Sequence, residues 1–349
     1  MRTKLIALGI IVAAAAALSA QPAYQLHDNG NLWVNTGIAC SGVSCPGWVL
    51  LDNHPTTVEI AVAAGGVPAD KQDTPDADPT PLYQRRSDGT VWDYTGTPCN
   101  NGACLGWRQI DDNQEIVSIV AASLDKKIKL YEHRKNGIWR YLWKPCSQGS
   151  CLGWEQLDNV PTAEIIATGA ELYQRRTDGK IMRYKGTPCG NPTSCWESLD
   201  ANSSTLQITA TLVNTSVAPN VPRLYQRRAD GTIWLYREES RTWQRIGKNT
   251  HAISIVAGTN KFGRGLFLLE DTGAIRNYTS PCADESPCTG WPLLDSNPQT
   301  RQIAAGPASL YQRRENGAIL RYTGPECPGG SCWQFLDIPP MRTIVSSRN

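Results

Sequence analysis

Short runs of apolar and aromatic residues alternate with polar turn residues along the whole chain, and one such arrangement keeps returning. The segment 82–94, LYQRRSDGTVWDY, contains an apolar-aromatic run, a Ser-Asp-Gly turn and a second aromatic run. This order predicts a β-hairpin. Close copies start at Leu172, Leu224 and Leu310, and looser copies start near Tyr24, Leu130 and Leu266. The chain therefore contains seven related units.

Each hairpin is flanked by two further segments of strand character. Before a hairpin lies a run rich in β-branched and small residues, such as EIVSIVAAS at 115–123, and after a hairpin lies a run such as GWRQIDDN at 106–113. The units show no helical spacing of apolar positions. The glycines of successive turns are 42 to 59 residues apart, which is typical of supersecondary units that stack on one another.

Repeated units of four short strands predict an all-β fold, a seven-bladed β-propeller of four-stranded blades. The first unit opens at its second strand, near Tyr24, whereas the chain finishes with a run of first-strand type, RTIVSS at 342–347. We therefore expect the C-terminal strand to complete the first blade and to close the ring, which also protects edge strands.

The first twenty residues have the pattern of a secretory signal peptide. Arg2 and Lys4 precede an apolar stretch at 5–18, and the small residues Ser19 and Ala20 follow it. The stretch is short for a bilayer-spanning helix, and no later segment is apolar for long enough to span a membrane. We expect a signal peptide at 1–20, a single propeller domain at 21–349 and a secreted, extracellular protein.

Charge argues against nucleic acid as a partner. Without Arg2 and Lys4, the 34 basic residues fall to 32, which equals the 32 acidic residues. Binding to nucleic acid without sequence preference depends on an excess of positive charge. The sequence gives no indication of the oligomeric state.

The twelve cysteines form six close pairs, and each pair lies between the third and fourth strand of its unit. The fifth unit, with REESRTW at 237–243, lacks the pair. In an exported protein, an even number of locally paired cysteines predicts disulfides, whereas a zinc site would require two pairs to converge across the ring. The expected disulfides join Cys40 to Cys45, Cys99 to Cys104, Cys146 to Cys151, Cys189 to Cys195, Cys282 to Cys288, and Cys327 to Cys332.

The repeated hairpins carry the candidate binding residues. Period-two alternation places Arg86 beside Leu82 and Gln84 on one side of a blade, and Trp92 shares a side with Tyr94. Guanidinium donors next to aromatic faces suit a sugar, whose hydroxyls need directed hydrogen bonds. The candidate carbohydrate-binding residues are Arg86, Trp92, Tyr94, Arg134, Trp139, Tyr141, Arg176, Tyr184, Arg228, Trp234, Tyr236, Arg314 and Tyr322.

A structural role for the same residues is the alternative. The repeated arginines could pair with the acids that recur in the Leu-Asp corners, and the tryptophans could fill gaps between blades. The corner acids considered are Asp111, Asp158, Asp200, Asp295 and Asp337. The repeat pattern leaves both roles open.

Catalysis has little support in the sequence. The four histidines, His27, His54, His133 and His251, occupy unrelated positions and have no nucleophile or metal spacing. The Asp-Gly and Asn-Gly strings lack the acid series of a calcium loop and indicate hairpin turns. We expect a lectin-like protein that binds glycans or glycoconjugates at repeated sites between blades, with no enzyme activity, no cofactor and no metal. Two alternatives stay open: a carbohydrate-active enzyme, a lyase or glycosidase, with one axial pocket, and a protein-binding scaffold.

The repeated order of a Trp-x-x-Leu-Asp corner, a small-residue strand and Leu-Tyr-Gln-Arg-x-x-Gly-x-Ile-Trp-x-Tyr resembles the repeats of β-propeller lectins of the tectonin type. The resemblance covers essentially the chain from residue 21 onward. The units here are longer and add the cysteine pair. The resemblance implies glycan binding at sites repeated around the ring. The sixth unit has Leu268, Leu269 and Glu270 in place of Gln-Arg-Arg, so we expect no site there.

Overall fold

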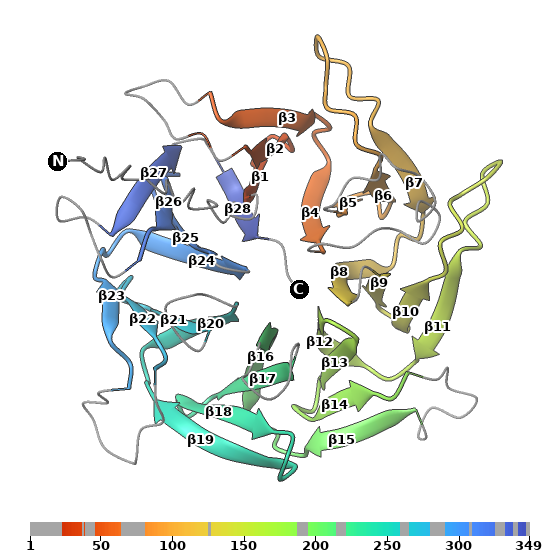
Figure 1. Cartoon of the computed structure of the whole chain (residues 1–349). Coiled ribbons are helices and arrows are strands. Elements are labelled where there is room, and N and C mark those ends of the chain that lie inside the picture. Colours follow the sequence, from red (N-terminus) through yellow and green to blue (C-terminus); the bar gives the residue numbers. More distant parts are fainter. Residues whose placement is uncertain are drawn as a thin grey trace, which may run out of the picture.

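A computed structural model shows a ring of seven four-stranded antiparallel sheets, so the predicted seven-bladed β-propeller is confirmed (Figure 1). The structure describes residues 23–36, 38, 46–63, 81–124, 127–186, 195–213, 221–258, 265–279, 290–306, 309–324, 332–337 and 341–346. The predicted signal peptide lies outside these residues. Among the residues that are described, no helix is long and apolar enough to cross a membrane.

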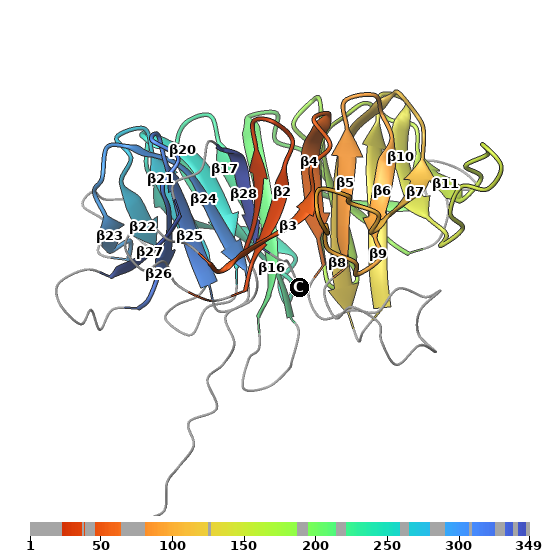
Figure 2. The same ribbon diagram turned by 90° about the horizontal axis from the view of Figure 1, so that it is seen from above.

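Each blade runs from an inner strand near the axis of the ring to an outer strand at the rim (Figures 1 and 2). Blade 1 contains β28 (Met341–Ser346), β1 (Ala23–His27), β2 (Leu32–Asn35) and β3 (Trp48–Asp52); blade 2 contains β4 (Thr57–Val62), β5 (Leu82–Arg86), β6 (Val91–Tyr94) and β7 (Trp107–Asp111); blade 3 contains β8 (Ile116–Leu124), β9 (Lys127–Arg134), β10 (Gly137–Tyr141) and β11 (Trp154–Asp158); blade 4 contains β12 (Thr162–Thr168), β13 (Glu171–Arg176), β14 (Ile181–Tyr184) and β15 (Trp196–Asp200). Blade 5 contains β16 (Thr205–Val213), β17 (Val221–Arg228), β18 (Thr232–Arg237) and β19 (Thr242–Lys248); blade 6 contains β20 (Ala252–Ala257), β21 (Leu266–Glu270), β22 (Ile275–Asn277) and β23 (Leu293–Asp295); blade 7 contains β24 (Thr300–Gly306), β25 (Ser309–Arg314), β26 (Ile319–Tyr322) and β27 (Trp333–Asp337).

The ring is closed by the two ends of the described chain. The inner strand β28 pairs antiparallel with β1, and this register places Ala23 opposite Ser346 and Tyr24 opposite Val345. The side chain of Ile344 is buried. The prediction that the C-terminal strand completes the first blade is confirmed.

The apolar core is divided among the gaps between blades. One cluster joins Tyr24 and Leu51 of blade 1 to Ile60 and Leu82 of blade 2, and the other clusters also combine residues of adjacent blades. Each blade is therefore stabilised mainly by burial against its neighbours, as in other stacked repeats.

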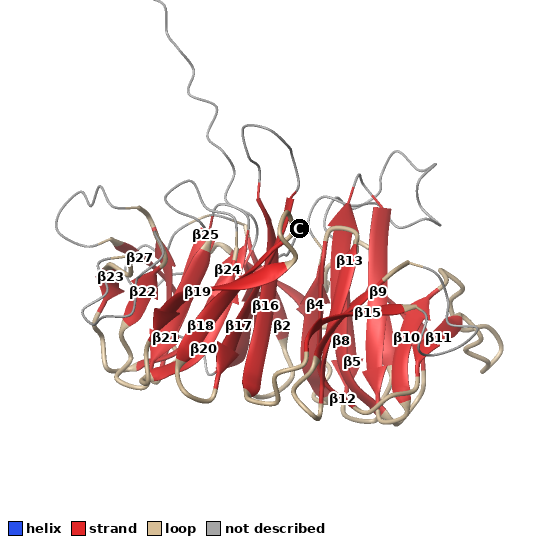
Figure 3. Ribbon diagram, turned by 90° about the horizontal axis from the view of Figure 1, so that it is seen from below, coloured by secondary structure: helices blue, strands red, loops and turns tan. Residues whose placement is uncertain are grey.

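The hairpin turns require glycine. Gly89 has a φ of 87°, and a Cβ at this position would lie 2.5 Å from the Cα of Gln114 in the corner that leaves the blade. The hairpin turns and the corners therefore pack together on one face of the disk, which Figure 3 shows along its lower side.

Each outer strand contains a β-bulge one residue before the corner acid or its equivalent. In blade 2 the register passes from Trp92 opposite Gln109 to Val91 opposite Asp111, which leaves Ile110 as the extra residue. The extra residues are Leu51, Ile110, Leu157, Leu199, Ile246, Leu294 and Leu336. The inner strands carry a second series of bulges near their first residue. The extra residues there are Val58, Val117, Ala163, Leu206, Ile253, Arg301 and Arg342.

Ring closure by β28 gives the first prediction. Deleting residues 339–349 should lower the midpoint of thermal unfolding strongly, because it leaves the edge of β1 unpaired and removes Ile344, whose burial alone contributes about 2 kcal/mol. Deleting only residues 347–349 is the matched control and should leave the midpoint unchanged. Equal midpoints for the two truncated chains would contradict the closure.

Candidate functional site

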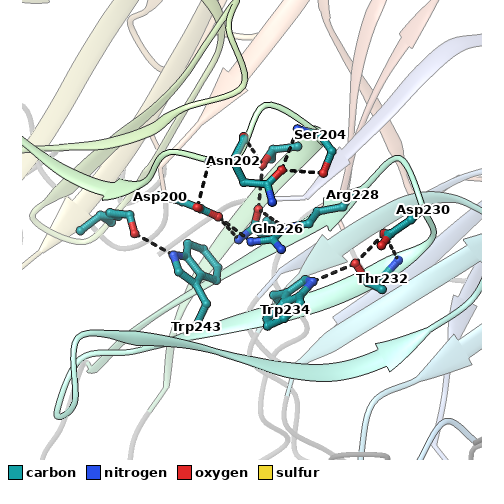
Figure 4. Close-up of polar contacts among 11 residues, drawn as sticks. Asp200, Asn202, Ser204, Gln226, Arg228, Asp230, Thr232, Trp234 and Trp243 are labelled. Carbon is teal, nitrogen blue, oxygen red and sulfur yellow. Dashed lines mark hydrogen bonds and ion pairs between the residues drawn. The ribbon is translucent and has the colours of Figure 1, made fainter. Parts of the chain in front are cut away.

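A buried polar network joins the outer strand of one blade to the next blade. Between blades 4 and 5, Asp200 accepts a hydrogen bond of 2.7 Å from Nε2 of Gln226 and one of 2.8 Å from Nη2 of Arg228 (Figure 4). The hydroxyl of Thr205 donates to Oε1 of Gln226 at 2.8 Å. The carboxylate is thus satisfied by two side chains of strand β17.

The same arginine stacks on a predicted site tryptophan. The guanidinium carbon of Arg228 lies 4.3 Å from the centroid of the Trp234 ring, and the indole Nε1–H of Trp234 donates to the Thr232 hydroxyl at 2.8 Å (Figure 4). Such an arrangement adds cation–π attraction to the ion pair. The polar groups of both side chains are therefore engaged within the chain.

The network recurs around the ring. The arginine–aspartate distances are 3.6 Å for Arg86–Asp52, 2.9 Å for Arg134–Asp111, 3.6 Å for Arg176–Asp158, 2.8 Å for Arg228–Asp200 and 3.8 Å for Arg314–Asp295. Arg86 and Arg134 also stack on Trp92 and Trp139, each at 4.3 Å.

The partners follow chain order, since each arginine reaches the corner acid of the preceding blade. Asp52, which the sequence interpretation did not include, therefore pairs with Arg86. Asp337 accepts a hydrogen bond from Gln25 instead, because blade 1 has His27 in the arginine position. The ion pairing considered as the structural alternative is present in five blades, and the carbohydrate-binding assignment of these residues stays a prediction.

The predicted site tyrosines pack against the outer-strand tryptophans. Ring centroids are 5.0 to 5.3 Å apart in the pairs Tyr94–Trp107, Tyr141–Trp154, Tyr184–Trp196, Tyr236–Trp243 and Tyr322–Trp333. These tryptophans also bind the preceding blade. The indole Nε1–H of Trp107 donates to the bulge carbonyl of Leu51 at 2.8 Å, and Trp243 makes the same contact with Leu199 at 2.8 Å.

The sequence interpretation considered tryptophans between blades as an alternative role, but it did not single out these outer-strand residues. The available signal was a Trp that stands four residues before each corner acid, as in Trp107 and Asp111.

At the interface between blades 5 and 6, all four positions of the network hold other residues. Gly247 stands in place of the corner acid, Leu268 in place of the glutamine and Glu270 in place of the arginine. Arg276 replaces the tryptophan and forms an ion pair with Glu270 at 2.5 Å. At this interface all four positions differ from the common set, and Glu270 and Arg276 keep the charges paired.

Blade 3 contains an acidic variation of the same unit. Glu132 occupies the glutamine position, is fully buried and lies with Asp111 around Arg134, whose Nε donates to Glu132 at 2.8 Å. Burial, followed by repulsion from Asp111, raises the pKa of Glu132 well above its usual range. A protonated Glu132 can donate to Asp111 as the glutamine amide does in the other blades.

The channel side of the blades carries a second set of polar contacts. Glu59 forms an ion pair with Arg85 at 2.7 Å and accepts the backbone N–H of Ile119 in the next inner strand at 3.2 Å. Gln207 and Ile255 exchange two hydrogen bonds of 3.0 Å in the same way. These side chains satisfy backbone groups at the inner edges that have no strand partner.

Apolar side chains are exposed where the inner strands begin. Val117, Leu206 and Ile253 are 46%, 47% and 48% exposed, and Ala163 between them is also exposed. All four are the bulged residues of consecutive inner strands, β8, β12, β16 and β20, on the face that carries the corners. We call Val117, Ala163, Leu206 and Ile253 the channel-mouth arc.

Two of the predicted disulfides are described and confirmed, Cys99–Cys104 and Cys146–Cys151. Cys195 and Cys332 are also disulfide-bonded, whereas Cys40, Cys45, Cys189, Cys282, Cys288 and Cys327 lie outside the described residues. The loop of Cys99 lies on the preceding blade, because its backbone N–H donates to the carbonyl of Leu50 on β3 at 3.1 Å.

The histidines lie in separate blades. His27 stacks on Trp33, and the ring nitrogen of His251 lies 3.2 Å from the carboxylate of Asp271. Burial lowers the pKa of His133. One group of possible metal ligands occurs in the described part of the chain, Asp111 with Asp112 and Cys151, but the sulfur of Cys151 is held in a disulfide.

Comparisons with known proteins give distant likenesses only. No family model and no curated protein matches the chain. Similar solved structures include human WBSCR16, at 10% identity, TM-score 0.48 and coverage of 86% of this chain and 88% of that one. Yeast RCC1 (Prp20) bound to Kap60 gives 11% identity, TM-score 0.48 and coverage of 93% and 85%. YCF48 from Cyanidioschyzon merolae gives 11% identity, a TM-score of 0.46 and coverage of 80% of this chain and 85% of that one.

The inter-blade network gives the second prediction. Arg228→Ala should reduce the free energy of unfolding by about 3 kcal/mol, because it leaves the carboxylate of Asp200 without its ion pair in a mostly buried position. Denaturant titration measures this change. Arg301→Ala is the control, since its ion pair with Glu315 is exposed and contributes less than about 1 kcal/mol. A loss for Arg228→Ala no larger than that of the control would refute the structural role.

The buried acid of blade 3 gives the third prediction. Above the ordinary value of 4.5, the unfolded chain loses the Glu132 proton while the folded chain keeps it, so the stability of the protein falls as the pH rises. Glu132→Gln should therefore stabilise the protein at pH 7, and the gain should vanish near pH 4, where the folded and unfolded chains both carry the proton. Glu315→Gln is the surface control. Destabilisation by Glu132→Gln at pH 7 would show that the ionised form is native.

Proposed function

We propose that the chain is a non-catalytic protein-binding scaffold, whose partner docks on the channel-mouth arc. The exposed apolar side chains of this arc carry the proposal. Leu206 and Ile253 are each nearly half exposed on adjacent inner strands and have no structural requirement to be apolar there, since Arg301 occupies the same bulge position in blade 7.

The division between polar and apolar residues supports this choice. The conspicuous repeated residues, such as Arg228 and Trp234, form hydrogen bonds and ion pairs within the ring. The arc, in contrast, differs from blade to blade in side-chain size, from Ala163 to Leu206. Different side chains on a rigid repeated frame give a surface that one particular partner can complement.

Glycan binding is the second candidate. The indole rings of Trp92, Trp139 and Trp234 are half-buried and repeat on the same side of their blades. A partly open indole ring is a stacking surface for a sugar. A glycan array with the purified protein tests this candidate, and binding at several sites per chain would favour it over the scaffold.

We propose that the protein is secreted. The apolar leader at 5–18 has the length of a signal sequence, and the two described disulfides are of a kind that persists in oxidising compartments.

The arc gives the fourth prediction. In the double variant Leu206→Asp, Ile253→Asp, the amount of partner protein captured should fall by at least about tenfold. The reason is that each buried aliphatic side chain contributes about 1.5–3 kcal/mol to an interface. Quantitative affinity capture from the protein's native medium measures the loss.

Leu293→Asp is the matched control, because Leu293 is equally exposed, at 51%, on the outer strand of blade 6. The proposal predicts partners that are retained by this control and lost by the double variant. Capture that is identical for the wild type and both variants would rule out the arc as the docking surface.

A further inference from the structure

The cysteine loops cover the outer edge of the preceding blade. In an outer strand, one side of the backbone pairs with the third strand and the other side faces outward. Cys99 of blade 2 donates its N–H to Leu50 on the edge of β3, and Cys146 of blade 3 donates to Gln109 on the edge of β7 at 3.3 Å. The side-chain amide of Asn53 also donates to the carbonyl of Gly102 at 3.0 Å and holds this loop against the corner of blade 1.

Blade 5 cannot cover its neighbour in this way. It lacks the cysteine pair, and its strands β18 and β19 continue pairing to Arg237 opposite Thr242, with only a short turn between them. The strand that this turn leaves without a covering loop is β15, the outer strand of blade 4. Among the described residues, no backbone group outside β14 bonds to the main chain of β15.

Burial at the end of β15 agrees with the missing cover. The bulged residues of blades 1, 2 and 3, namely Leu51, Ile110 and Leu157, are buried, whereas Leu199 of blade 4 is only half-buried. The corner acid follows the same trend, because Asp52 is buried and Asp200 is partly exposed. Leu294 and Asp295 of blade 6 are also partly exposed, so burial alone does not distinguish blade 4. The open edge is inferred from the missing loop and from the exposed Ser198 in the middle of β15.

The register identifies the backbone groups on this edge. Ser198 stands opposite Met182, as Leu50 stands opposite Trp33 and Gln109 opposite Trp92. The carbonyl of Ser198 is thus equivalent to the two carbonyls that accept the loop N–H groups. Alternation along the strand places the N–H and C=O of Trp196 on the same side.

We propose that β15 is a site of β-strand addition, where an extended, uncharged segment of a partner protein forms main-chain hydrogen bonds with the exposed Ser198. The cysteine loops provide the precedent, because in two blades the protein's own backbone donates a hydrogen bond to the equivalent edge. Strand addition to an open sheet edge is a general mode of peptide recognition. This site is separate from the channel-mouth arc and does not depend on the function proposed for the arc.

The charges beside the edge favour an uncharged segment. Arg183 forms ion pairs with Glu197 and with Glu238, both at 2.7 Å, and Arg241 lies 3.9 Å from Glu197. Two guanidinium groups thus balance two carboxylates at this position. A charged side chain on the added strand would find no uncompensated partner among these four groups.

The test uses a phage-displayed library of ten-residue peptides as the probe and the full-length chain as the target. Selected peptides are measured by fluorescence anisotropy against the wild type and against Ser198→Pro. Proline removes the outward N–H and places its ring on the edge, but it costs no ladder bond with β14 at this position. We expect the affinity to fall by at least about tenfold, the effect of losing roughly one to two hydrogen bonds.

A second variant protects the test against misfolding of the first. Replacing residues 238–241 with residues 96–106, the cysteine loop of blade 2, should cover β15 and should also abolish peptide binding. N-methylation of alternate peptide amides should have the same effect. Leu206→Asp, Ile253→Asp should leave peptide binding unchanged, so the two proposed surfaces fail or succeed separately.

Three results would overturn the proposal. These are the failure to select any peptide, binding that survives both the Ser198→Pro change and the loop graft, and binding that N-methylation does not affect. A concentration-dependent dimer of the wild type that Ser198→Pro abolishes, seen by analytical ultracentrifugation, would show that the occupant is a second copy of the chain.

Discussion

The ion pair between a corner carboxylate and the arginine of the next blade is the polar contact that recurs at five of the seven blade interfaces. The acid ends an outer strand, and the arginine ends the second strand of the following blade, so each pair connects two sheets whose described strands are not paired with one another. A buried carboxylate has a large desolvation penalty and therefore requires its partners. At the interface of blades 4 and 5, Gln226 and Thr205 complete these partners, and the bulge at Leu199 also presents a carbonyl to Trp243.

Much of the fold could be predicted from the sequence because the strand signal is local and repeated. The seven copies of the hairpin, with their flanking strand-type runs, predicted the blades, and the C-terminal RTIVSS run predicted the closure by β28. The pairing of arginine with a corner acid could be foreseen as an alternative, but its exact partner could not. Asp52 was missed since the register between blades depends on three-dimensional proximity, which no single unit encodes.

The channel-mouth arc could not be predicted, and the reason is geometric. Leu206 and Ile253 look like ordinary strand residues in runs whose alternate positions are buried, and only a bulge near the first residue turns them outward. The sequence contained one sign of the open edge of β15, because the fifth unit lacks its cysteines. This absence could be interpreted only from the hydrogen bond between Cys99 and Leu50, which shows that a cysteine loop covers the outer strand of the preceding blade. Function in this ring is therefore best sought where the units differ.

The central claim is that the repeated arginines are structural. The most direct test transfers the residues found between blades 5 and 6 into the interface between blades 4 and 5. The four residues Asp200, Gln226, Arg228 and Trp234 can be converted together to Gly, Leu, Glu and Arg, the set found as Gly247, Leu268, Glu270 and Arg276. If the four residues act as a unit, the free energy of unfolding of the quadruple variant will exceed that of Arg228→Glu alone. The effects of the four substitutions on stability will then be strongly non-additive. A quadruple variant less stable than the single variant, with additive losses, would contradict the account.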